Sequence, residues 1–64
     1  MPGGRVGDKI ELVEIMSPSS VLVPGDRGVI RRVDHTGSIS VEWENGFYVL
    51  LIPGVDAWRV LEEV

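Results

Sequence analysis

The chain has 64 residues, of which 10 are acidic and 6 basic, giving a formal net charge of -4; it has one histidine and no cysteine. This length allows one small domain at most, and the lack of cysteine excludes disulfides and thiolate metal sites. The acidic balance argues against nucleic acid as a partner, because phosphate neutralisation usually requires a basic face. No apolar stretch is long enough for a signal peptide or a membrane span, so a cytoplasmic location without membrane contact is expected.

The first third of the chain predicts a lead-in, a strand and a long loop. Residues 1–7 hold three of the eight glycines and are expected to be a flexible N-terminal lead-in to a domain at 8–64. Period-two alternation predicts a strand over 8–15. The loop at 16–25 has an apolar centre, Val21-Leu22-Val23, that we expect to fold back on the core.

The rest of the chain predicts four more strands, at 27–34, 38–44, 47–52 and 57–62. In the first of these, Val29, Ile30 and Val33 cannot all face one side of a flat strand, so strong bending or a bulge near Arg31-Arg32 is expected. The strand at 38–44 alternates strictly between apolar and polar residues. Asn45-Gly46 follows it and predicts a type I′ hairpin turn. The strand at 47–52 is apolar on both faces, so something should cover each face.

Five short strands joined by tight turns favour an all-β fold, a small five-stranded SH3-like barrel, because closure removes exposed sheet edges. An OB-fold barrel is the alternative, but it usually needs more residues and a helix. The predicted core consists of the inward-facing strand residues Ile10, Leu12, Ile30, Val33, Ile39, Val41, Trp43, Val49, Leu51 and Val60.

Four segments together resemble a family of small bacterial and phage domains known only as a domain of unknown function. They are Gly7-Asp8, the stretch 24–30, the stretch 41–46 with its Trp-x-Asn-Gly motif, and the stretch 51–56 with Leu-x-Pro-Gly-x-Asp. The same outline is similar to other SH3-like barrels, among them KOW-type ribosomal and transcription-factor modules and small accessory subunits of photosynthetic electron-transfer complexes. The resemblance implies the barrel and no catalytic residue.

The sequence does not predict an enzyme. His35 beside Asp34 lacks the further ligands that a metal site needs. Ser17, Ser19 and Ser20 lie in a loop without an activating base. The glycines occupy turns and precede no helix that could bind a phosphate. We therefore expect no catalytic residues, no metal and no cofactor.

Two surfaces could bind partners. Tyr48, Leu50 and Ile52 share the second apolar face of the strand at 47–52, and Trp58 near the chain end could expose one ring face; these are the candidate protein-binding residues. Arg27, Arg31 and Arg32 form the only basic cluster, and they can either pair with Glu42 and Glu44 or contact a phosphate backbone. The prediction is a non-enzymatic protein-binding module of unknown role. A KOW-like nucleic-acid module and a structural subunit or small homo-oligomer are the alternatives.

Overall fold

The fold is a single five-stranded antiparallel sheet, seen in a computed structural model that describes residues 4–16 and 21–61. The strands are β1 (Lys9–Glu14), β2 (Arg27–Val33), β3 (Ile39–Trp43), β4 (Tyr48–Leu51) and β5 (Ala57–Val60). The described ranges contain no helix, so the all-β prediction is confirmed. No helix that is long and apolar enough to cross a bilayer is found in the described ranges.

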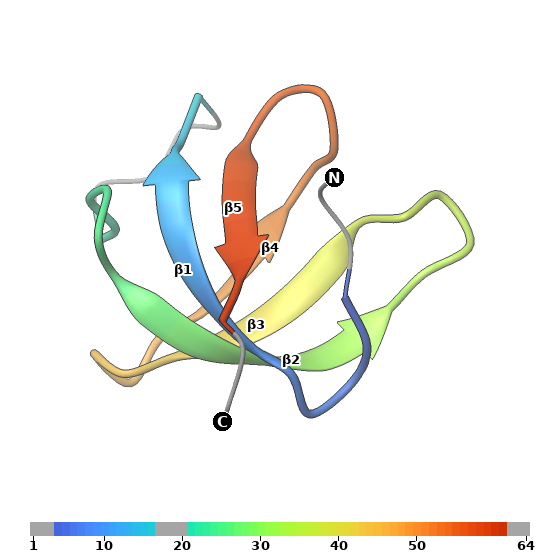
Figure 1. Cartoon of the computed structure of the whole chain (residues 1–64), viewed down its shortest axis with the longest axis horizontal. Helices are drawn as coiled ribbons and strands as arrows, with labels where there is room; N and C mark the ends of the chain where they lie inside the picture. The colour runs from blue at the N-terminus through green and yellow to red at the C-terminus, as the bar shows by residue number, and fades with distance from the viewer. Residues whose placement is uncertain (1–3, 17–20, 62–64) are drawn as a thin grey trace.

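The sheet is strongly bent, with the strand order β4-β3-β2-β1-β5. Figure 1 shows β2 and β3 running beneath β1 and β5, so that one concave side encloses the core. Within the described ranges β4 pairs only with β3, and β5 only with β1. The sheet therefore folds over its core as a barrel does, without a hydrogen-bonded seam between its two end strands.

The predicted bulge in β2 is confirmed. The β2–β3 register shifts between Ile30 and Arg32, which leaves Arg31 as the extra residue. Ile30 therefore lies opposite Val41, and Val33 lies opposite Ile39, although simple alternation would place Ile30 and Val33 on different faces. The bulge also changes where the arginines beside it point, because a bulge re-aims the side chains around it.

The core lies on the concave side, and seven of the ten predicted members are buried: Ile10, Leu12, Ile30, Ile39, Val41, Trp43 and Leu51. Val49 is partly buried and packs against them. Val33 and Val60 are 40% and 38% exposed, so their prediction is wrong. Each lies opposite a buried isoleucine, Ile39 and Ile10 respectively, but no neighbour covers it fully.

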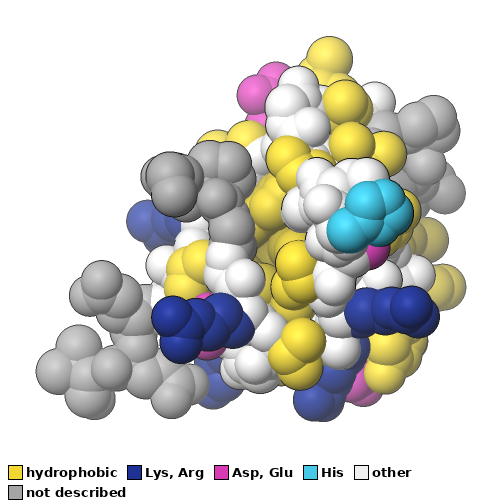
Figure 2. Space-filling view, turned by 90° about the vertical axis from the view of Figure 1, so that its right-hand side faces the viewer, with side chains coloured by type: hydrophobic (Ala, Val, Ile, Leu, Met, Phe, Trp, Pro, Cys, Tyr) yellow, Lys and Arg dark blue, Asp and Glu magenta, His cyan; other side chains and the backbone are white. Residues whose placement is uncertain are grey.

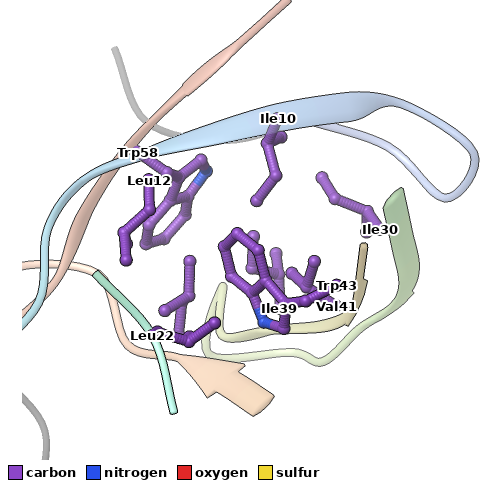
Figure 3. Packing of buried hydrophobic residues seen from close by; sticks show 9 residues of the cluster. Ile10, Leu12, Leu22, Ile30, Ile39, Val41, Trp43 and Trp58 are labelled. Atoms are coloured by element: carbon purple, nitrogen blue, oxygen red, sulfur yellow. The ribbon is translucent and has the colours of Figure 1, made fainter. Parts of the chain in front are cut away.

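Two residues that were not predicted complete the core, Leu22 and Trp58. Figure 3 shows the two indole rings near the centre of the cluster, with Leu22 reaching in from the long loop. Of the three aliphatic residues at the centre of the loop, Leu22 is buried, Val21 is partly buried and Val23 is exposed. The loop thus folds back as expected.

The Asn45-Gly46 hairpin is present, but the prediction of a type I′ turn is wrong. Among the described residues only glycines have positive φ, and Gly46 has φ 92°. The Gly46 amide donates to the carbonyl of Trp43, which closes a turn before Gly46, and the Trp43 amide donates to the carbonyl of Phe47. This is a three-residue loop with glycine in the left-handed position. The Asn45 side chain also holds this loop, because its Oδ1 accepts from the Phe47 amide and its Nδ2 donates to the carbonyl of Val21.

Truncation of Val41 should measure how tightly this core is packed. Val41 is fully buried at the centre of β3. We expect Val41→Ala to lower the free energy of unfolding by about 2–3 kcal/mol, since it leaves a cavity among side chains that cannot close in. Denaturant unfolding followed by tryptophan fluorescence checks this. A loss below about 0.5 kcal/mol would show that Val41 does not contribute to the packing of the core, contrary to the structure.

Candidate functional site

Three large apolar side chains are exposed on the outer face of β4 and directly after its last residue. Tyr48, Leu50 and Ile52 are 65%, 46% and 40% exposed, whereas Leu51 between them is fully buried. The alternation of side chains along an extended strand explains this division. The predicted grouping of Tyr48, Leu50 and Ile52 on one face is therefore confirmed. Phe47, which was expected to begin this strand, lies in the hairpin before β4 and is exposed.

The fourth candidate, Trp58, does not join this surface. Trp58 is 5% exposed, so the expectation of an exposed ring face is wrong. In the β1–β5 register Trp58 lies opposite Leu12, and directly opposed residues of antiparallel strands share a face. Since Leu12 is in the core, Trp58 is directed there as well. The hollow beside β5, which includes Trp58 and Val55 in its lining, is a separate feature.

Tyr48 belongs to a small polar network on the same outer face. In the β3–β4 register Tyr48 lies opposite Glu42, and its hydroxyl donates to Glu42 Oε1 at 3.1 Å. Arg31 Nε donates to the same oxygen at 2.9 Å. The predicted pairing of an arginine with Glu42 is thus confirmed for Arg31. These hydrogen bonds, that of Arg31 first and that of Tyr48 second, lower the pKa of Glu42 below its ordinary value.

Removal of the Tyr48 hydroxyl should shift the titration of Glu42. We expect Tyr48→Phe to raise the pKa of Glu42 towards its ordinary value, because the carboxylate then loses one donor that favours its charged form. An NMR titration of the side-chain carboxyl checks this, with Glu11 as the internal control. A Glu42 pKa that stays unchanged would show that the Tyr48 hydroxyl does not bind it in solution.

Three carboxyl groups with lowered pKa values determine how the stability of the fold depends on pH. Glu11, Asp34 and Glu42 all have lowered pKa values, the first because of Arg59, the second because of the Thr36 hydroxyl and the third because of Arg31. A carboxyl whose pKa is lower in the folded state stabilises the fold above its unfolded pKa, and this contribution is lost as the pH falls through the folded value. We therefore expect stability to fall on acidification below about pH 4, measured by denaturant unfolding from pH 7 to pH 2.

The three arginines of the predicted basic cluster do not form one site. Arg27 pairs with Glu11 on the β1 side of the sheet, where Arg59 binds the same carboxylate. Arg31 and Arg32 flank the bulge at the other end of β2. Figure 2, which views the molecule towards the β2–β3 turn and its histidine, shows Lys and Arg side chains separated by hydrophobic ones on that face.

The Asp34–His35 turn has a structural use. Asp34 Oδ1 accepts hydrogen bonds from the Thr36 amide, the Thr36 hydroxyl and the Ser38 amide, which closes the β2–β3 turn. Over residues 4–16 and 21–61 no group of three or more histidine, aspartate or glutamate side chains is placed to hold a metal ion. Ser17, Ser19 and Ser20 lie outside the described residues.

A comparison with protein families tests the resemblance that the segments at 7–8, 24–30, 41–46 and 51–56 indicated. A domain of unknown function, DUF4314, matches residues 5–61. The chain belongs to this family. The DUF4314 match spans all five strands and includes both the Trp-x-Asn-Gly and the Leu-x-Pro-Gly-x-Asp motif. Searches of curated proteins and of solved structures found no match.

The two motifs of the resemblance prove to be anchors for the long loop. Asn45 binds the carbonyl of Val21 in the centre of the loop. At the start of the loop, the buried carboxylate of Asp56 accepts from the Met16 amide, and it also accepts from the Ile52 amide. Sequence reasoning placed Asn45 in a hairpin turn and Asp56 in a motif of the resemblance, and it missed these contacts. The combination of an apolar loop with an isolated Asn and Asp in later turns was the signal that could have indicated them.

Proposed function

We propose that this domain is a non-enzymatic protein-interaction module on an SH3-like scaffold, and that it binds through the outer face of β4. The observation that carries the proposal is the exposure of three large apolar side chains, Tyr48 and Leu50 on β4 and Ile52 directly after it. Exposed apolar groups that gather on one surface are typical of interaction sites, whereas scattered ones are not.

Two further features support the proposal. The long loop has apolar residues that could have covered this face, but the one that is buried, Leu22, contributes to the core with Trp43 and Trp58. A domain of 64 residues also has a small core, so additional burial against a partner would increase its stability. Tyr48 suits such a face, because tyrosine combines a large apolar ring with a polar hydroxyl.

Site-specific photo-crosslinking in the cells that naturally make the protein tests the proposal. A photoreactive benzoylphenylalanine is placed at Leu50 and, in a matched control, at Val13, an aliphatic residue of similar exposure on β1. We expect a defined protein adduct from position 50 and little or none from position 13. An adduct at twice the mass of the chain would identify a second copy as the partner, and another mass a different protein. Equal or absent adducts at both positions would refute the proposal.

A further inference from the structure

We infer that this face selects a partner segment that presents a carboxylate near an apolar side chain, held by Arg32 and Leu50. The inference rests on the proposed function and specifies the chemistry of the partner. It starts from the bulge in β2. Arg32 lies directly opposite Ser40, and Ser40 lies directly opposite Leu50. Directly opposed residues of antiparallel strands share a face, so the three form a row across the outer side of the sheet.

Arg32 differs from the other strand arginines, because it has no acidic partner among residues 4–16 and 21–61. Arg27 and Arg59 both bind Glu11, and Arg31 binds Glu42. Arg32 is exposed and has no hydrogen bond or ion pair with any residue in the described ranges. An arginine guanidinium matches a carboxylate in both charge and shape. Among the residues that the structure describes, Arg32 is therefore a strand arginine without an acidic partner, and it lies next to exposed apolar surface.

The spacing of this row indicates what the partner segment looks like. Arg32 and Leu50 lie two strands apart, which corresponds to roughly 10 Å between their backbones, with the short side chain of Ser40 between them. Alternate side chains of an extended chain point to one side and lie roughly 7 Å apart. A segment of the form acid-x-apolar can therefore place its carboxylate by Arg32 and its apolar side chain against Leu50, because arginine is long enough to close the remaining gap.

The net charge of the protein separates this partner from a nucleic acid. With a net charge of -4, the chain does not attract polyanions over long distances. A contact through one guanidinium should weaken only modestly with salt, whereas a phosphate-backbone complex weakens steeply with salt in proportion to the phosphates neutralised. The free arginine thus favours a single carboxylate at short range.

An NMR titration of the isotope-labelled full chain tests the inference. The probes are the capped peptide Ser-Glu-Ser-Leu-Ser and the same peptide with Gln in place of Glu. We expect the Glu peptide to shift the backbone amides of Arg32, Ser40 and Leu50 in the millimolar range, and to bind about threefold more tightly than the Gln peptide. Arg32→Gln should remove this preference. The control Arg59→Gln, which changes the net charge equally at a distant position, should keep it.

Three results would overturn the inference: equal binding of the two peptides, equal loss of binding in the two variants, or tighter binding of a single-stranded oligonucleotide to the same amides with a steep salt dependence. Amide spectra of both variants show whether the fold is retained, and surface substitutions of this kind rarely disturb it. Crosslinking from Leu50 does not depend on the charge of the partner. A position-50 adduct combined with equal binding of the two peptides would therefore leave the proposed function standing and refute the carboxylate preference alone.

Discussion

Asp56→Ala should lower the free energy of unfolding by about 3 kcal/mol, a large share of the stability of a domain this small. Asp56 is buried, and its two carboxylate oxygens accept from the amides of Met16, at 2.9 Å, and Ile52, at 3.0 Å. These contacts join the end of β1 to the turn between β4 and β5. Alanine would leave two partly buried amides without an acceptor, and such unmade hydrogen bonds cost more than made ones contribute.

Denaturant unfolding measures this loss, and Asp26→Ala provides the control. Asp26 accepts from one exposed amide, that of Val23, so water can replace its contact. We expect a loss of no more than about 1 kcal/mol for Asp26→Ala. Similar losses in the two variants would show that Asp56 acts as an ordinary turn residue and does not anchor the sheet.

Gly28→Ala should also destabilise the fold, by about 2–3 kcal/mol, because β2 and β3 approach each other closely at this position. An added Cβ would lie 2.6 Å from Cγ1 of Val41 and 2.7 Å from the carbonyl oxygen of Glu42. The second contact is with backbone, so rotation of a side chain cannot relieve it. The strands would have to separate in the part of the sheet that packs Trp43 into the core.

Gly25→Ala separates this steric effect from the general cost of replacing glycine. Gly25 has φ 100° and nothing within 4 Å of an added Cβ, so alanine there meets backbone strain alone. We expect it to cost about 1 kcal/mol. Thermal and denaturant unfolding of both variants test the comparison. A Gly28→Ala protein as stable as the original chain would contradict the close packing of β2 on β3.

The residues on the outer face of β4 could be predicted from the sequence, because the alternation of side chains along a strand is a local property. Tyr48, Leu50 and Ile52 share a face in any extended conformation. That Val49 and Leu51 face inward was predicted, and the register bears this out by placing them opposite Val41 and Ile39 of β3. The bulge near Arg31-Arg32 was one of two expected solutions for the same reason, because Ile30 and Val33 fall on opposite faces of a regular strand.

Only the tertiary structure decided how these faces are used. Alternation places Trp58 and Arg59 on opposite faces of β5, but it does not show which of them faces the core. The register does, because it places Trp58 opposite the core residue Leu12. The partners of the arginines also depend on register: Arg31 binds Glu42 while Arg32 is left opposite Ser40. Asn45 and Asp56 bind loop residues 24 and 40 positions away in the chain. The five strands and their faces follow from local periodicity, whereas these pairings arise only when distant segments pack together.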